Sequence, residues 1–284
     1  KKNTTYIVKL NEELDLSKKI FGKCNPKSST GRLDIFCRTI LDYSDEYEKI
    51  PYNYKGEIFL EITSRSFDII LKKGDSLNQM RLIYEYNNYI IDSKLIKLQK
   101  SDPIIFDQHK KSCDISVLSG LKIGVDLNNK NTISAFKAKK QAPILNFSKL
   151  KKHNVFDFWT PLKAKNSTIT IKPGNFYILK SKQKIRIPPN MAGEMVPYDT
   201  GIGDFRVHYA GFFDPGFGHN HTGGKGSRAV LEVRSHDVPF VLEDGQMVGR
   251  LLYQRLTKTP DQLYGSKIGS NYQKQGLKLS KHFK

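Results

Sequence analysis

The sequence predicts an all-β protein built from two related copies. Three observations support this: short strand-like runs between turn residues, very few helical patterns, and a repeat at constant spacing. The runs alternate apolar and polar residues or are rich in β-branched residues, as strands are. They span 6–10, 58–62, 67–71, 168–171, 176–179, 229–233, 240–242 and 250–253. The one short helix we expect is at 146–152, so a distorted barrel or sandwich is predicted for each copy.

The repeat is visible in two separate segments. Residues 22–26 resemble 193–197, which begin 171 residues later, and the same spacing separates Glu61 from Glu232. A constant offset in two segments indicates a duplication. Two further segments, each Arg-Leu-x-Tyr, are taken as equivalent: 81–84 and 250–253.

The copies are predicted to span 1–110 and 119–284, because Lys-rich polar sequence interrupts the strand pattern between 95 and 119. The second copy has a leading segment, 120–172, with no counterpart in the first. We therefore expect the sequence to be incomplete at its N-terminus.

Composition excludes several classes of protein. A hydrophobic content of 38% is ordinary for a globular protein, and no apolar run is long enough to span a bilayer. The net charge of +19 comes mostly from scattered lysines, without a nucleic-acid-binding motif, so we expect neither nucleic acid nor membrane as partner. Three distant cysteines predict no disulfide framework and favour the cytoplasm. Three histidines, which we interpret as part of a solvated loop rather than a zinc site, are His208, His219 and His221.

In the first copy, the turn Pro26-Lys-Ser-Ser-Thr-Gly-Arg32 has the chemistry of an anion site. Hydroxyl and backbone N–H groups donate to oxyanions, and cations neutralise them. The candidate residues are Lys27, Ser28, Ser29 and Arg32. Without further support, the same residues would also fit an ordinary turn.

In the second copy, a run ending Asp214-Pro-Gly-Phe-Gly218 predicts a turn with aromatic neighbours. Glu232 follows on a predicted strand among apolar residues, where a carboxyl tends to have a raised pKa suited to proton transfer. The Gly-punctuated tail from Tyr264 through Gln275 is too polar for a core and suits a segment that folds over a ligand.

These residues together resemble the dCTP deaminase branch of the dUTPase superfamily, in its long, duplicated form. The similarity covers nearly the whole chain. The matching positions are the Ser-Ser-x-x-Arg phosphate motif (Ser28, Ser29, Arg32), the Ala…Asp-Pro-Gly-aromatic motif (Ala210, Asp214, Phe217), the Leu-Glu strand (Glu232) and the tail (Tyr264, Gln275).

The resemblance implies dUTPase-like β-barrel domains and the hydrolytic deamination of dCTP to dUTP. It implies that the glutamate activates a water which attacks C4 of cytosine, and that Ser28, Arg32 and the Ala210 carbonyl hold this water. Lys27, Ser29, Asp214, Phe217, Tyr264 and Gln275 are the implied substrate contacts. No cofactor is expected for the chemistry, and Mg²⁺ enters bound to the triphosphate.

Neither copy carries every motif, so we expect a composite site that uses Ser28 and Arg32 with Glu232. The alternative is a site within the first copy that uses Glu61. A lysine of the family's tail is replaced by Asn271, a role that Lys267 or Lys274 would then take.

Two other functions stay open at this point. One is dUTP pyrophosphatase activity, alone or combined with deamination; the other is a nucleotide-sensing or nucleic-acid-binding module without catalysis. The family resemblance further suggests dTTP as a feedback ligand and a homo-oligomer, either a trimer or a dimer of two-copy chains.

Overall fold

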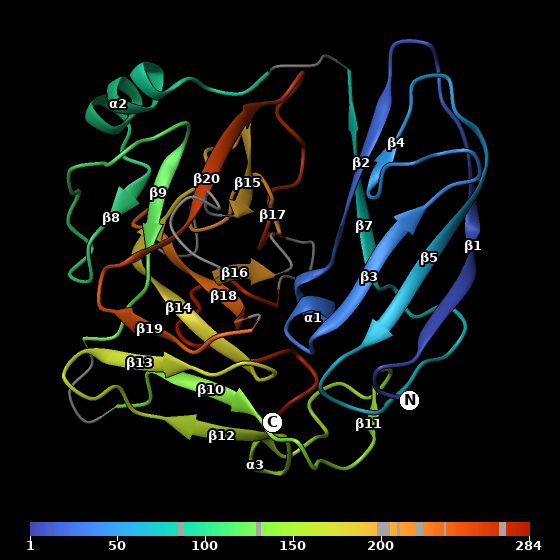
Figure 1. The fold of residues 1–284 in the computed structure, drawn as a ribbon. Coiled ribbons are helices and arrows are strands. Elements are labelled where there is room, and N and C mark those ends of the chain that lie inside the picture. The colour runs from blue at the N-terminus through green and yellow to red at the C-terminus, as the bar shows by residue number, and fades with distance from the viewer. Residues whose placement is uncertain are drawn as a thin grey trace. The chain divides into compact units, whose positions relative to one another are not determined.

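The computed structural model describes residues 1–84, 88–128, 132–197, 205–208, 211–219, 224–235, 237–266 and 271–284 (Figure 1). The chain forms two compact units. Unit 1 comprises Lys1–Asn87, Lys139–Trp159 and Ser280–Lys284, and unit 2 comprises Asn88–Ala138 and Thr160–Leu279. These units follow contacts in space, whereas the copies 1–110 and 119–284 were separated where Lys-rich sequence interrupts the strand pattern, and they stay a prediction.

Unit 1 contains two three-stranded antiparallel sheets, ordered β1-β5-β3 and β4-β2-β7, and one short parallel pair, β6 with β11. Its elements are β1 (Thr5–Asp15), β2 (Phe21–Pro26), α1 (Ser28–Gly31), β3 (Ile35–Ile40), β4 (Lys49–Ile50), β5 (Lys55–Ser64), β6 (Ile69–Ile70), β7 (Asn78–Ile83), β11 (Leu145–Asn146) and α3 (Val155–Phe158).

Unit 2 contains a larger sheet, β12-β10-β14-β18-β16 with β8 on β14, a four-stranded sheet, β17-β15-β20-β9, and the pair β13-β19. Its elements are α2 (Asp92–Ser101), β8 (Ile105–Phe106), β9 (Leu121–Gly124), β10 (Ala135–Ala138), β13 (Thr168–Ile171), β14 (Phe176–Ile185), β15 (Met191–Pro197), β16 (Phe205–His208), β17 (Phe212–Phe213), β18 (Ser227–Ser235), β19 (Phe240–Glu243) and β20 (Met247–Arg255). Strand β12 (Trp159–Leu162) has its first residue in unit 1 and the others in unit 2.

The strand pairings of unit 1 recur in unit 2 at the spacing found in the sequence. Strand β1 pairs with β5, with Thr5 opposite Thr63. Strand β14 pairs with β18, with Phe176 opposite Arg234, and each of these residues lies 171 positions after its counterpart. The all-β class and the internal repeat predicted from the sequence are therefore confirmed.

The irregularities of the pairing are repeated as well. The register of β1 against β5 shifts between Lys9 and Glu13, and that of β14 against β18 shifts between Lys180 and Lys184. Bulges are specific features of a strand pair. Their recurrence at equivalent positions shows that both copies share backbone detail as well as strand order.

One part of the sequence alignment was wrong. In β7, Arg81 lies opposite Lys23, and at the equivalent place in β20 it is Leu252 that lies opposite Glu194. Arg81 is therefore equivalent to Leu252, and the predicted match of 81–84 with 250–253 is out by two residues. A shift of two keeps each side chain on the same face of a strand, so the hydrophobic pattern does not reveal it.

Each unit has an apolar interior. In unit 2, the core takes fully buried side chains from β9, β14, β18 and β20, among them Ile123, Leu179, Leu231 and Tyr253. In unit 1, the rings of Phe67, Phe158, Trp159 and Phe283 pack edge to face, with centroids 5.4–6.1 Å apart. This geometry is favoured by aromatic quadrupoles.

The predicted helix at 146–152 was wrong. Leu145 and Asn146 form strand β11 instead, and the Asn146 side chain then accepts a hydrogen bond from Ser148 N at 3.1 Å. Such a local bond competes with helix formation.

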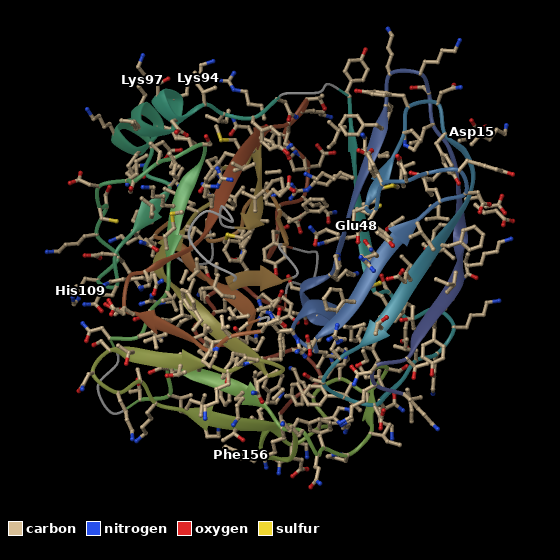
Figure 2. All side chains as sticks on the ribbon, viewed as in Figure 1. Asp15, Glu48, Lys94, Lys97, His109 and Phe156 are labelled. Carbon is tan, nitrogen blue, oxygen red and sulfur yellow. The ribbon has the colours of Figure 1, made fainter. Side chains whose placement is uncertain are left out.

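Helix α2 was not predicted, because its sequence is mostly polar. Leu95 is its one fully buried apolar residue, and Lys94 and Lys97 on its exposed side point away from the unit (Figure 2). In the described part of the chain, no helix is long and apolar enough to cross a membrane.

Candidate active site

Glu232 lies on β18, a strand that is paired on both sides. Ile178 of β14 and His208 of β16 are opposite it in the register. The alternation of the strand places Ala229, Leu231 and Val233 in the core, and Glu232 on the other face. Glu232 is nevertheless only 6% exposed. Backbone pairing on both sides fixes its position, which suits a group that must meet one atom of a substrate.

The Asp-Pro-Gly turn follows β17 and depends on two glycines with left-handed backbone. A Cβ at Gly218 (φ +64°) would lie 2.2 Å from the Ile185 carbonyl oxygen, and one at Gly216 (φ +90°) 2.8 Å from the Leu263 Cβ. Phe217 N donates to Asp214 O at 3.1 Å and closes the turn, while Asp214 itself is exposed.

Tyr264 lies against this turn. Its backbone N–H donates to Pro215 O at 2.8 Å, and its ring is 5.8 Å from that of Phe217. Phe217 is 4% exposed and belongs to the core of unit 2, where it also contacts Phe213. The structure thus brings Asp214, Phe217 and Tyr264 together, with Phe217 acting as their apolar support.

The tail after Tyr264 is docked on β18. Gln275 N donates to Ser227 Oγ at 3.1 Å, and Gln275 Nε2 donates to Arg228 O at 2.9 Å. Gln275 is buried, as is Tyr272. The tail is therefore fixed to the same strand that carries Glu232.

Sequence reasoning missed Gln273, which joins the tail to the turn. Gly218 N donates to Gln273 Oε1 at 3.0 Å. Gln273 Nε2 in turn donates to Gly216 O at 3.1 Å and to Tyr264 O at 2.8 Å. Its only signal in the sequence is its place in the polar tail, two residues before Gln275.

A group of charged residues at the start of β18 was also missed. Asp126 Oδ2 lies 3.0 Å from Arg228 Nη1 and 3.3 Å from Lys180 Nζ, and all three side chains are largely buried. Arg228 also donates to the carbonyls of Ser181 and Lys182 at 2.5 and 2.6 Å. It thereby satisfies carbonyl groups in the bulge of β14 next to the place where the tail docks.

The phosphate motif forms a short helical turn in unit 1. Thr30 N donates to Lys27 O at 2.8 Å, and Arg32 N donates to Ser28 O at 3.1 Å. Ser29 and Arg32 are buried, with exposed fractions of 6% and 3%. Lys27, Ser28, Ser29 and Arg32 therefore lie on one short helical turn, and their role in binding phosphate stays a prediction.

This turn is held from two sides. Thr30 Oγ1 donates to Leu77 O at 2.7 Å, and Ser280 Oγ donates to Ser29 O at 2.8 Å. The Ser280 hydroxyl has one proton, and it donates this proton to Ser29 O. The 2.8 Å contact between Ser280 Oγ and His282 Nδ1 is therefore a hydrogen bond in which the histidine N–H donates. His282 is fully buried, and burial lowers its pKa to about 4. The neutral ring therefore belongs to the fold of unit 1.

Glu61, the alternative catalytic residue, is engaged in an ion pair. Arg38 Nε donates to Glu61 Oε1 at 3.0 Å, and the guanidinium carbon lies 4.0 Å from the Tyr47 ring centre. This is a common arrangement for two strands in contact.

Some predicted residues lie outside the described part of the chain: Ala210, Lys267 and His221, together with the side chain of His208. Asn271 and Lys274 are both exposed on the tail. Among the described residues, no group of three or more His, Cys, Asp or Glu is arranged to hold a metal ion. Ser28 and Arg32 belong to unit 1 and Glu232 to unit 2, so their use in one composite site stays a prediction.

Comparison with known proteins agrees with these motifs. The sequence-family model for the 2'-deoxycytidine 5'-triphosphate deaminase N-terminal domain matches residues 1–86. The family model for the C-terminal domain matches residues 91–283. A crystal structure of 2'-deoxycytidine 5'-triphosphate deaminase from Agrobacterium tumefaciens is 42% identical, with a TM-score of 0.84, over 90% of this chain and 76% of that one.

Curated relatives named "dCTP deaminase, dUMP-forming" match a shorter stretch. Those of Mycobacterium avium (strain 104) and Mycobacterium tuberculosis (strain ATCC 25177 / H37Ra) are each 31% identical over 109 residues, 37% of this chain. The chain spans about half of their length, 53% in each case. Because the two domain models together account for nearly every residue, the chain belongs to the 2'-deoxycytidine 5'-triphosphate deaminase family.

Proposed function

We propose that this protein catalyses the hydrolytic deamination of dCTP to dUTP and ammonia. The observation that carries the proposal is the placement of Glu232, a buried carboxyl on the strand where the tail docks through Gln275. The family models and the 42% identical deaminase structure support the substrate class.

In the proposed reaction, Glu232 moves two protons. The oxygen of a water molecule forms a bond to C4 of cytosine while one proton passes through the carboxylate to N3. The second proton of that oxygen then passes through Glu232 to the amino nitrogen. The C4–N bond breaks with its electron pair on nitrogen, ammonia leaves, and C4 becomes a carbonyl. General acid–base catalysis of this kind contributes on the order of 10² to 10⁴ in rate.

The remaining roles follow the family resemblance residue by residue. Ser28, Arg32 and the Ala210 carbonyl hold the water and stabilise the developing charge. Donors on the turn after Lys27, including Ser29, bind the triphosphate, which enters as its magnesium complex. The exposed Asp214 carboxylate accepts hydrogen bonds from the nucleoside, and Tyr264 and Gln275 contact it from the docked tail. Feedback by dTTP, assembly as a homo-oligomer and a cytoplasmic location are further parts of the proposal.

The test is to incubate the protein with dCTP and magnesium, separate the nucleotides by anion exchange and measure ammonia. We expect equal amounts of dUTP and ammonia. Glu232→Gln should lower kcat by on the order of 10² or more while dCTP still binds.

The matched variant is Glu61→Gln, at the equivalent position of the first copy. We expect it to keep wild-type turnover, because Glu61 is paired with Arg38. Full activity in Glu232→Gln together with loss in Glu61→Gln would transfer the catalytic role to the first copy.

A second candidate function is favoured by the relatives whose names describe them as dUMP-forming. In that case the protein would also release pyrophosphate from dUTP, giving dUMP. Feeding dUTP alone and measuring pyrophosphate separates the two activities. Tight binding of dCTP without any ammonia would instead indicate a nucleotide-sensing module.

A further inference from the structure

Gln273 connects three segments of unit 2 through a single side chain. Both ends of its amide are used: the oxygen accepts from Gly218 N, and the nitrogen donates to Gly216 O and Tyr264 O, all within 2.8–3.1 Å. Gly216 and Gly218 belong to the turn that presents Asp214. The amide group therefore holds the turn, the Tyr264 segment and the tail in one fixed arrangement.

The residues around Gln273 make this arrangement cooperative. Tyr272 is buried on one side of it, and Gln275 is docked on β18 on the other. If the tail lifted from β18, Gly218 N would lose the Gln273 oxygen, Tyr264 O would lose the Gln273 nitrogen, and Gly216 O would keep only the hydrogen bond from His219 N. Conversely, if the Asp214–Gly218 turn had another backbone conformation, Gly218 N and Gly216 O would not both lie within hydrogen-bonding distance of the Gln273 amide.

We propose that Gln273 is a positioning residue which locks the tail onto the Asp214–Gly218 turn, so that Asp214, Tyr264 and Gln275 form one preassembled nucleotide-binding surface. The proposal rests on the proposed function for the identity of the nucleotide. Gln273 acts through these three residues, because all its polar contacts described here are with backbone groups of the protein.

The expected effect is on binding more than on chemistry. Glu232 is held by the pairing of β14 and β16 with β18, independently of Gln273. Removing three neutral hydrogen bonds from the docked tail should raise the KM for dCTP roughly 10- to 100-fold, while kcat stays within about threefold.

The variants are Gln273→Ala and Gln273→Glu. The glutamate keeps an acceptor for Gly218 N but places a carboxylate opposite two carbonyl oxygens, so it should raise KM, by less than the alanine does. Gln262→Ala, an exposed glutamine of the same unit, is the matched control and should behave as wild type.

The direct readout is amide hydrogen exchange of the protein without nucleotide, followed by mass spectrometry of peptides covering 211–219. Because Gly218 N–H bonds to the Gln273 side chain, its exchange should become at least tenfold faster in Gln273→Ala and remain protected in Gln273→Glu.

Unchanged exchange and unchanged KM in Gln273→Ala would overturn the proposal. A parallel loss of kcat and of thermal stability would also overturn it, because that result indicates a merely structural role. If the wild-type protein does not deaminate dCTP, the proposed function fails, and the exchange of Gly218 still decides whether Gln273 locks the tail.

Discussion

Glu48 provides a test of the structure that is independent of activity. It lies between β3 and β4 inside unit 1 (Figure 2), where its backbone N–H donates to Thr39 O. Burial raises the pKa of Glu48 from 4.5 to about 7, and this outweighs the opposing hydrogen bonds from Asn78 and Thr39 and the charge of Arg38. Asn78 Nδ2 is 3.5 Å from Glu48 Oε2, which is a long contact for a hydrogen bond.

The sign of the pH effect follows from the raised pKa. The folded protein holds this proton more tightly than the unfolded chain, so stability is lost as the pH rises from about 4.5 to about 7. At 1.36 kcal/mol per unit of pKa, the full loss is about 3 kcal/mol. Between about pH 5 and about pH 8, the loss expected from this group alone is about 2 kcal/mol.

The assay is urea unfolding of wild type and Glu48→Gln at several pH values. Trp159, the single tryptophan, is fully buried in unit 1 and reports its unfolding by fluorescence. Glu48→Gln mimics the protonated carboxyl, so it should be the more stable protein by about 3 kcal/mol at about pH 8, and by about 1 kcal/mol at about pH 5. Glu46→Gln, an exposed neighbour, serves as control. A difference between wild type and Glu48→Gln that does not change with pH would refute this reasoning.

Three further substitutions test the packing of the site. Gly218→Ala should destabilise unit 2 by about 2–4 kcal/mol, seen as a lower Tm, because the new Cβ meets a carbonyl oxygen at 2.2 Å in left-handed backbone. Ser280→Ala should cost about 1 kcal/mol and speed amide exchange in 28–31, whereas an unchanged exchange rate would remove Ser280 as a support of that turn. Arg228→Met leaves the Asp126 carboxylate with Lys180 as its cation, so it should lower the free energy of unfolding in urea by about 3–5 kcal/mol. An unchanged free energy of unfolding would show that the Asp126–Arg228–Lys180 group is not truly buried.

The strand-rich class and the repeat could be predicted because both depend on local pattern. Period-two alternation and turn residues specify most strands directly. The run at 67–71 shows the limit, since only Ile69–Ile70 forms a strand there, in parallel pairing with β11. The pairing partner of such a short strand lies far away in the sequence, so the local alternation of apolar and polar residues does not predict it.

The site was predictable as a set of motifs and not as a set of contacts. The sequence indicated the tail and the Asp-Pro-Gly turn, but an amide such as Gln273 carries no signal of which backbone groups it will bind. The same applies to His282, whose burial in unit 1 follows from the path of the last five residues. The sequence likewise does not reveal that Glu48 is partly buried, because the residues around it come from β2, β3 and β7.

The two copies show how one scaffold gives its equivalent glutamates different surroundings. On β5, Glu61 lies opposite Arg38 in the register, and these two side chains form an ion pair. On β18, the residue opposite Glu232 is His208. A carboxylate engaged by a guanidinium is poorly suited to take a proton from water and return it, because each transfer would break the pair. The register therefore gives the two equivalent glutamates different cross-strand neighbours, and it is Glu61 whose carboxylate is engaged by the arginine opposite it.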